Sequence, residues 1–423
     1  MKDWREVNLG EICTKITDGA HHSPKSVECG LPMASVKDLT GFGINLDSCR
    51  MISDDDFHKL IKQGCMPEVG DVLIAKDGAT ALDTVCLVRK PVNVVLLSSV
   101  AILRPDNTQV DGKFLQLFLD ASTTKAYMKA AFTTGAAIPR VILKDFKRAH
   151  VHLPPLPTQR RIASILSSYD DLIENNMHRI AILEEMARRL YEEWFVKFRF
   201  PGHEDVIFKE TELGVLPEEW SHVPLGDMYK TSSGGTPSRK QPDYYEGDIL
   251  WVKTKELNDG PIFDTEEKIT ELGLSKSSAK LFPPRSVIIA MYGATIGQLG
   301  VLLEEASTNQ ACCALLPSEN SYGWAYAFLT MMCRRQDLID LRAGAAQQNI
   351  SQAIIKQFPV IAADSTTHEM FEEAARPLLE LTFVLQRKNA NLRAQRDLLL
   401  LKLVSGQIDV SEIELLDIEE VAA

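Results

Sequence analysis

The chain has 423 residues and a formal net charge of −12. A single hydrophobic core stops growing at about 250–300 residues, so this length predicts two or more domains. The longest apolar run, residues 93–103, is interrupted by two serines and is shorter than the roughly 18–20 residues that span a bilayer. No basic and apolar leader precedes the first globular residues, so we expect a soluble, cytoplasmic protein.

The acidic charge lies mostly in the second half of the chain. Residues 1–156 have a net charge of +1, 157–200 of 0, 201–361 of −7 and 362–423 of −6. This balance argues against a simple basic DNA-binding module, because lysine and arginine supply much of the affinity for phosphate. The eight cysteines show no C-x-x-C spacing, which favours reduced thiols over a zinc site.

In chain order, the sequence first predicts a globular part at residues 1–156. Short β-branched and apolar runs bounded by turn residues predict strands at 71–76, 84–89 and 93–103, and a helical pattern covers 113–131. A long helix follows at 157–200, where apolar residues recur with heptad spacing until Phe200-Pro201-Gly202. Its two rows are Leu166, Ile173, Ile180, Ala187 and Trp194, and Tyr169, Asn176, Leu183 and Leu190.

A linker at 201–219 leads to a second globular part at 220–361, with strands at 249–253, 286–291 and 299–303 and a helix at 323–342. A second long helix is expected at 362–406, followed by an acidic tail at 407–423. Its main row is Phe371, Leu378, Leu385, Leu392 and Leu399, with Ala374 and Leu381 on the other row. Pro377 predicts a kink or break near the start of this helix, because proline lacks the N–H that a helix needs.

The two halves echo each other at an offset of about 215 residues. The matching pairs are Trp4-(x4)-Leu9-Gly10 with Trp220-(x4)-Leu225-Gly226, Val36-Lys37-Asp38-Leu39 loosely with Val252-Lys253 and Glu256-Leu257, residues 72–80 with 287–295, and Gly135-Ala136-Ala137 with Gly344-Ala345-Ala346. Four landmarks in the same order predict a tandem duplication, in which each copy has a globular part and a helix.

Two single-stripe helices at equivalent places favour an antiparallel coiled coil over two unrelated surface helices, and Asn176 in a core row would fix its register. A helix of about 40 residues is about 60 Å long. The sequence therefore predicts an α+β fold with two domains held apart by a rigid spacer, an arrangement that suits two DNA half-sites.

Several runs resemble a known family. Ser233-Gly-Gly-Thr-Pro-Ser238, Gly247-Asp-Ile-Leu-Trp-Val252 and Val287-Ile-Ile-Ala-x-x-Gly-Ala-Thr-Ile-Gly297 resemble the target recognition domain of Type I restriction-modification specificity subunits, and 153–163 resembles that family's entry into its first spacer helix. The first copy has Asp18-Gly-Ala-His-His-Ser-Pro24 in place of the Gly-Gly-Thr-Pro run, as expected if the two domains bind different sequences. Residues 360–364 lack the proline-rich entry, which leaves the start of the second helix open.

The resemblance implies that the chain is a non-catalytic adaptor. Each target recognition domain would bind one half of a bipartite site on double-stranded DNA, and the helices would hold two modification subunits. Those subunits would bind S-adenosylmethionine and methylate adenine, and two restriction subunits would add ATP- and magnesium-dependent cleavage. No cofactor, metal or membrane contact is expected in this chain, and its acidic charge predicts weak DNA binding by the chain alone.

The candidate DNA contacts are polar and basic residues at matching places in the two copies. Arginine, lysine, glutamine and asparagine pair with phosphates and base edges, and glycine-rich turns allow close approach of the backbone to phosphate. The candidates are Lys15, Thr17, His21, His22, Lys25, Lys37, Lys76 and Arg140 in the first copy, and Ser233, Thr236, Arg239, Lys240, Lys253, Lys255, Tyr292, Gln347, Gln348 and Asn349 in the second. For each of them the alternative is a solvated surface group.

Two other functions remain open. Asp243, Glu266 and Lys268 loosely fit a magnesium-dependent nuclease pattern, although a chain with 58 acidic residues contains such a pattern by chance. The acidic net charge also fits a coiled-coil scaffold that does not bind DNA. The glycines at 293, 297 and 300 lack the Lys-Ser/Thr of a phosphate-binding loop.

Overall fold

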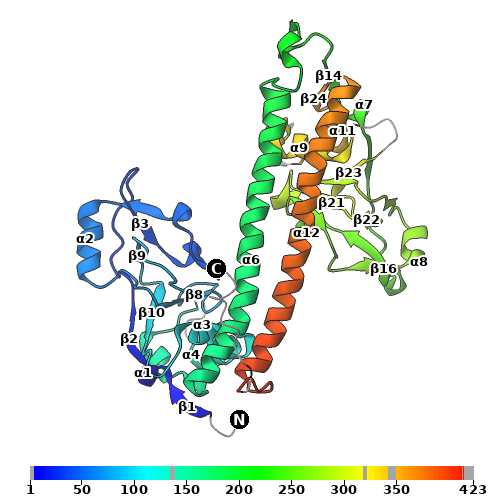
Figure 1. Cartoon of the computed structure of the whole chain (residues 1–423). Helices are drawn as coiled ribbons and strands as arrows, with labels where there is room; N and C mark the ends of the chain where they lie inside the picture. The colour runs from blue at the N-terminus through cyan, green and yellow to red at the C-terminus, as the bar shows by residue number, and fades with distance from the viewer. Residues whose placement is uncertain (1–3, 134–138, 318–321, 342–348, 412, 414–423) are drawn as a thin grey trace. The chain divides into compact units, whose positions relative to one another are not determined.

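The computed structural model describes residues 4–133, 139–317, 322–341, 349–411 and 413. The chain divides into two compact units: unit 1 contains residues 1–175 and 389–423, and unit 2 contains residues 176–388. Two long helices, α6 and α12 in Figure 1, are each divided between the two units. Helix α6 (Leu156–Tyr191) begins in unit 1 and ends in unit 2, whereas α12 (Ser365–Val404) begins in unit 2 and ends in unit 1. Each unit therefore contains one globular domain and one segment of each long helix.

The globular domain of unit 1 contains a main sheet with the order β2-β10-β7-β8 and a second sheet with the order β6-β3-β9. In the second sheet, β9 is parallel and β6 antiparallel to β3. The first and last strands, β1 and β11, form an antiparallel ribbon, and β4 pairs with β5. The strands are β1 (Arg5–Asn8), β2 (Cys13–Asp18), β3 (Leu31–Ala34), β4 (Leu39–Thr40), β5 (Gly43–Ile44), β6 (Arg50–Ile52), β7 (Val72–Ala75), β8 (Val85–Leu87), β9 (Val95–Leu96), β10 (Val100–Pro105) and β11 (His150–Leu153). The helices are α1 (Leu9–Ile12), α2 (Asp54–Lys62), α3 (Gly112–Asp120), α4 (Ser122–Phe132) and α5 (Leu143–Arg148).

The globular domain of unit 2 repeats this plan. Its main sheet has the order β15-β23-β20-β21-β17, and its second sheet has the order β18-β16-β22-β19, in which β22 is parallel and β18 antiparallel to β16. The strands are β12 (Phe208–Thr211), β13 (Gly214–Pro217), β14 (Ser221–Pro224), β15 (Lys230–Ser233), β16 (Tyr245–Val252), β17 (Gly260–Ile262), β18 (Lys268–Ile269), β19 (Leu281–Phe282), β20 (Val287–Ala290), β21 (Leu299–Leu302), β22 (Ala306–Thr308), β23 (Cys312–Leu316) and β24 (Pro359–Ala362). The helices are α7 (Leu225–Met228), α8 (Glu271–Ser275), α9 (Trp324–Cys333), α10 (Arg335–Asp340) and α11 (Gln352–Gln357).

The shared topology confirms the predicted duplication. The orders β2-β10-β7-β8 and β15-β23-β20-β21 match strand by strand, and every pairing in both runs is antiparallel. The ribbon β14–β24 in unit 2 matches β1–β11 in unit 1. Unit 2 adds the edge strands β17 and β19. The α+β fold class predicted from the sequence is therefore confirmed.

Within each unit the two long-helix segments pack against each other in opposite directions. In unit 1, Asn389 donates its amide N–H to the Ile173 carbonyl at 3.3 Å, and Arg396 pairs with Asp170 at 2.9 Å. The helices also contribute to the domain cores, with Ile162 and Leu403 in unit 1. In unit 2, the rings of Trp194 and Phe371 are 5.6 Å apart, and both belong to the core of that unit.

The residues of both predicted rows of α6 are buried or half-buried, as expected, but one predicted row of α12 is wrong. Ala374 and Leu381 are exposed, and the buried second row runs one residue later, through Ala375, Thr382 and Asn389. Two of these three side chains are polar, so the true row carried too little apolar signal to stand out from the sequence. Asn176, predicted in a core row of α6, is buried at 8% exposure.

Of the kink or break predicted at Pro377, the break is wrong, because α12 continues through this residue. Pro377 and Glu373, one turn earlier, are both exposed, so water can satisfy the carbonyl that the missing N–H leaves free. The start of the helix is set by Asp364. Its carboxylate accepts the Thr367 backbone N–H at 2.9 Å and the indole N–H of Trp220 at 3.3 Å.

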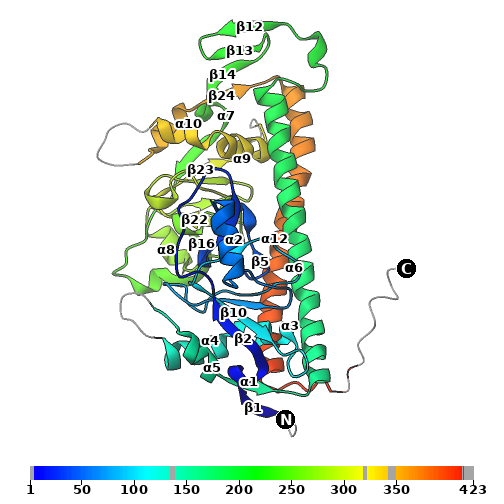
Figure 2. The same ribbon diagram turned by 90° about the vertical axis from the view of Figure 1, so that its left-hand side faces the viewer.

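Other element boundaries differ from the sequence expectation. The expected strand 93–103 is two strands, β9 and β10, separated by a turn, and the expected helix 113–131 is divided at Ala121, whose backbone is extended. Helix α6 ends at Tyr191, and a π-helical turn (Glu192–Val196) follows it. The expected linker 201–219 contains the hairpin β12–β13 (Figure 2). In the ranges that the structure describes, no helix combines the length and the apolarity needed to cross a membrane.

Candidate nucleic-acid interface

The candidate loops leave the main sheets at equivalent glycines. A Cβ atom on Gly19 would lie 2.1 Å from the Leu96 carbonyl oxygen, and one on Gly234 would lie 2.0 Å from the Thr308 carbonyl oxygen. The next residue in each copy donates its backbone N–H to that same carbonyl, at 2.7 Å from Ala20 and 2.9 Å from Gly235. These glycines therefore allow the backbone to pack against a neighbouring strand, which differs from the predicted approach to phosphate.

In unit 1, two aspartates hold the basic candidates beside this loop. The Lys76 ammonium lies 3.3 Å from Asp18 and 3.4 Å from Asp77, and its side chain is only 6% exposed. Arg140 binds Asp77 through two hydrogen bonds of 2.9 and 3.1 Å and remains 58% exposed. His21 lies 3.1 Å from Asp18. Arg140 and His21 are accessible to a ligand, whereas the charge of Lys76 is already satisfied inside the protein.

The remaining candidates of unit 1 lie on its surface. Thr17 is half-buried on β2, and the other four side chains are exposed: Lys15, His22, Lys25 and Lys37. Arg50, which the sequence did not single out, donates to the Pro24 carbonyl and to the Ser23 hydroxyl, both at 2.7 Å. It thereby holds the loop that carries His21, His22 and Lys25. Nothing in the spacing of Arg50 marks it for this role.

In unit 2, two glutamates hold the basic candidates. Arg239 forms two hydrogen bonds with Glu267, at 3.0 and 2.7 Å, and its guanidinium lies 4.5 Å from the Tyr245 ring centroid. Lys253 lies 3.1 Å from both Glu266 and Glu267. Hydrogen bonds from Arg239 and Lys253 lower the pKa of Glu267 to about 2, so this carboxylate stays charged at neutral pH.

Arg239 also lies 5.2 Å from the Trp251 ring centroid. The indole N–H of Trp251 donates to the Gly235 carbonyl at 3.0 Å, which connects the aromatic ring to the glycine loop. Arg239 is 54% exposed and Lys253 is 16% exposed. The guanidinium is therefore fixed in direction by a carboxylate and an aromatic ring while one side of it remains accessible, the usual condition for reading phosphate or guanine.

Three of the other candidates of unit 2 have side-chain partners. The Ser233 hydroxyl donates to Gln352 at 2.9 Å, Thr236 bonds Gln310, and Lys255 pairs with Glu266. Exposed side chains are found at Lys240, Tyr292 and Asn349. Gln347 and Gln348 lie outside the described residues, as do both Gly-Ala-Ala runs.

The structure corrects the register of one sequence echo. The Ser35 N–H donates to the Asp38 carboxylate at 2.8 Å, and the Lys253 N–H donates to the Glu256 carboxylate at 2.6 Å. Lys253 is therefore equivalent to Ser35, and Lys37 corresponds to Lys255, the middle residue of the equivalent short helix. The two copies place a lysine at this surface position, which supports treating Lys37 and Lys255 as a matched pair.

Two of the three residues of the nuclease pattern, Glu266 and Lys268, have ion-pair partners. Glu266 pairs with Lys253 and Lys255, Lys268 pairs with Asp264 at 3.1 Å, and the Asp243 carbonyl accepts the Thr270 hydroxyl at 2.7 Å. Glu266 and Glu267 thus act as counter-ions for the basic candidates, a role that the sequence pattern did not reveal.

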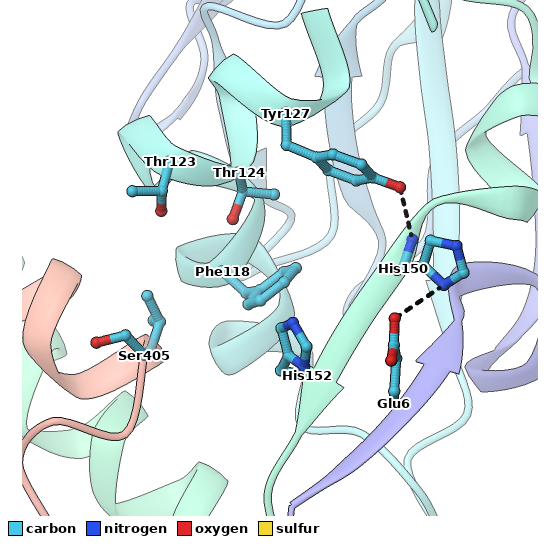
Figure 3. Close-up of a pocket in the computed structure, with 9 residues that line it drawn as sticks. Glu6, Phe118, Thr123, Thr124, Tyr127, His150, His152 and Ser405 are labelled. Carbon is cyan, nitrogen blue, oxygen red and sulfur yellow. Dashed lines mark hydrogen bonds and ion pairs between the residues drawn. The ribbon is translucent and has the colours of Figure 1, made fainter. Parts of the chain in front are cut away.

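Unit 1 also has a pocket of about 330 Å³, whose lining includes residues of the ribbon β1–β11 and of helices α3 and α4 (Figure 3). His150 on β11 and Glu6 on β1 face each other at 3.4 Å, and the His150 backbone N–H donates to the Tyr127 hydroxyl at 3.5 Å. Phe118, Thr123, Thr124, His152, Val404 and Ser405 complete the lining. The pocket contains none of the candidate DNA contacts.

Two tandem domains of one topology, each presenting cations beside an equivalent loop, define a duplicated recognition protein. The family model of the Type I restriction modification DNA specificity domain matches residues 1–185 and 217–362, which is most of the chain. The chain therefore belongs to this family. The family predicted from the sequence motifs is confirmed, and so is the α+β duplication that carries it.

Relatives agree with this assignment, and a solved structure has a similar fold. The chain is 25% identical over 308 residues to the Type I restriction enzyme MjaIX specificity subunit of Methanocaldococcus jannaschii, covering 72% of this chain and 71% of the relative. It is 23% identical to the HindI specificity subunit of Haemophilus influenzae, covering 96% and 100%. The crystal structure of a Type I restriction-modification S subunit from M. genitalium has a similar fold, with a TM-score of 0.62 at 15% identity over 95% of this chain and 96% of that one.

Proposed function

We propose that this chain, as a specificity subunit of a Type I restriction-modification system, binds one half of a bipartite DNA site with each globular domain and has no catalytic activity of its own. The observation that carries the proposal is the double match of the DNA specificity domain, one copy in each half of the chain. A protein that binds two half-sites needs two readers of one design, and the matched sheets of units 1 and 2 supply them.

The contacts divide the candidate residues by their availability to DNA. Arg140 and His21 in unit 1, and Arg239 in unit 2, combine exposure with a fixed direction set by carboxylates. Base readout needs both properties, because a freely rotating side chain loses entropy on binding. The exposed lysines at 15, 25, 37, 240 and 255 suit phosphate contacts, which set affinity without specifying sequence.

The long helices are proposed to dock two modification subunits, which would supply S-adenosylmethionine and the methyl transfer. Restriction subunits would add the ATP- and magnesium-dependent cleavage. The net charge of −12 supports a division of labour in which these partners supply much of the phosphate contact. The proposed location of the complex is the cytoplasm, where its DNA substrate lies.

The test is a genome-wide map of methylated adenines in cells with and without this gene. We expect methylation to disappear from one bipartite motif when the gene is deleted and to return when it is restored. If nothing changes, co-expression with the partner modification subunit becomes the deciding measurement.

Failure of that co-expression to produce a methylated motif would contradict the proposal. The purified chain with magnesium should then be tested for cleavage of plasmid DNA, with Asp243→Ala as the matched inactive variant. Cleavage that depends on Asp243 would favour a nuclease. A chain that neither binds nor cleaves DNA would favour a scaffold.

A further inference from the structure

The hairpin β12–β13 of unit 2 exposes an unusual number of apolar side chains. Phe208 is 44% exposed, Val215 50%, Leu213 62% and Ile207, immediately before the hairpin, 69%. The pairings Phe208 with Pro217 and Glu210 with Val215 place Phe208 and Val215 on one face of the ribbon. Single exposed apolar residues need no explanation, but four within nine positions form a patch that is typical of a protein interface.

The hairpin packs against other residues of unit 2 through part of its surface. Leu216 is buried, and the Phe208 ring lies 6.0 Å from the Phe198 ring. The Glu218 N–H donates to the Ile207 carbonyl at 2.8 Å. A preformed apolar surface loses little conformational entropy when a partner binds, which favours a docking role over a flexible connection.

The charge around this patch limits which kinds of partner can bind to it. The segment 203–219 contains six acidic residues and one lysine, and all six acids are exposed. Such a surface repels DNA phosphate and anionic lipid. It is complementary to a protein surface that has an apolar groove and a basic rim.

The size of the patch indicates that it belongs to a larger interface. A stable protein complex buries about 800 Å² on each partner, more than a four-residue patch provides. In the same unit, Ile182 and Met186 lie four residues apart on one face of α6 and are 59% and 50% exposed. The hairpin lies beyond the C-terminal end of this helix in Figure 2.

From these observations we infer that the hairpin is a docking element for a modification subunit, which receives Phe208, Leu213 and Val215 in an apolar groove rimmed by lysine or arginine. This inference rests on the proposed function, because that function places modification subunits on the helices. It adds a contact outside the helices and specifies the chemistry of the partner's surface.

The experiment measures binding of the purified modification subunit to the full chain by calorimetry at low and high salt. The first variant combines Phe208→Ser, Leu213→Ser and Val215→Ser, and the second combines Glu210→Lys and Glu212→Lys. Leu272→Ser and Glu305→Lys are the matched controls, since both residues are exposed in unit 2 away from the hairpin. We expect the apolar variant to raise Kd at least about tenfold. The charge variant should raise Kd more at low salt than at high salt, because salt screens the attraction between the acidic residues of the hairpin and the basic rim of the partner.

Unchanged Kd values for both hairpin variants, beside normal binding by the wild-type chain, would overturn the inference and leave the proposed function intact. No binding by the wild-type chain would contradict the proposed function itself, and the inference with it. As a third measurement, sedimentation of the chain alone gives its oligomeric state. A dimer that the hairpin variants convert to monomer would identify a second copy as the occupant and overturn the inference. The charge variant changes exposed side chains only, so it keeps the test decisive if the apolar variant folds poorly.

Discussion

Units 1 and 2 share a backbone plan but hold their cations in different ways. Gly19 and Gly234 pack against a strand carbonyl in the same manner. Beside the first, Lys76 is buried between two aspartates; beside the second, Arg239 stays half exposed on a glutamate and an aromatic ring. Steric demands of the sheet therefore fix the scaffold, whereas the charged surface is free to differ, as the proposed reading of two different half-sites requires.

The two units also attach the long helices through different groups at one equivalent position. Gln159 in unit 1 accepts the Asp111 N–H at 2.8 Å and donates to the Pro154 carbonyl at 2.8 Å. His368 in unit 2 accepts the Ala363 N–H at 3.1 Å and is buried at 4% exposure. Each residue occupies the fourth position of its helix. The difference predicts that pH affects unit 2 more than unit 1.

The largest expected effect tests the shared scaffold. Gly19→Ala and Gly234→Ala each place a Cβ atom about 2 Å from a backbone oxygen, so each variant should lose roughly 1–3 kcal/mol of stability or more. Thermal unfolding should show a midpoint several degrees lower in both cases. Gly41→Ala is the control, since no atom lies within 4 Å of its Cβ position. Normal stability of either variant would show that the two loops are not equivalent.

The second effect separates the units by pH. Burial lowers the pKa of His368 to about 3, so the folded state binds fewer protons than the unfolded state between about pH 6.5 and pH 3. Stability should therefore decrease as the pH falls through this window, by roughly 2–3 kcal/mol at pH 4 from this group. His368→Gln copies the residue of unit 1 and should remove that part of the decrease. Equal losses between pH 7 and pH 4 in the variant and the wild type would exclude this role.

The third effect concerns DNA affinity. Arg140→Ala and Arg239→Ala should each weaken binding of the assembled complex to its site about tenfold. Each variant should relax sequence preference in only one half of the site, because each arginine belongs to a different unit. Arg148→Ala is a control on an exposed arginine of unit 1. Loss of preference in both halves from one variant would contradict separate half-site readers.

The smallest effect tests the acidic counter-ions. Glu267→Gln removes a partner of Arg239 and Lys253, and should strengthen non-specific DNA binding about threefold, because an exposed ion pair contributes at most about 1 kcal/mol. Asp77→Asn should act similarly through Arg140. Fluorescence anisotropy on non-cognate DNA measures this change. Weaker binding by both variants would mean that the acids hold the cations in a productive direction.

The sequence revealed the duplication, the two long helices and the strands that run through both cores. It did not reveal the second row of α12, because Thr382, Asn389 and Arg396 occupy core positions with polar side chains. It also missed the hairpin in 201–219, whose exposed apolar residues break the usual alternation of a strand.

The candidate site was predictable only in part. Residue type and repeated position located the loops around His21 and Thr236, but they did not show which cations are neutralised within the protein. Lys76 and Lys253 have the same character in sequence as the exposed Lys15 and Lys240. Their partners Asp18 and Glu267 are 58 and 14 residues away, so pairing depends on the tertiary fold. The contacts of Gln347 and Gln348 remain predictions.

The division of the chain has a consequence for its synthesis. Unit 2 is one continuous stretch, residues 176–388, and its residues are all synthesised before residues 389–423 of unit 1. The core of unit 1 contains Leu400, Leu403, Val404 and Val410 beside Ile162, so it closes only after these residues have been made. The copy that is synthesised first therefore finishes folding last, and its contacts bridge more than 230 residues of chain. We therefore expect a chain that ends before residue 400 to fold its second domain and to leave the first one open and prone to aggregation.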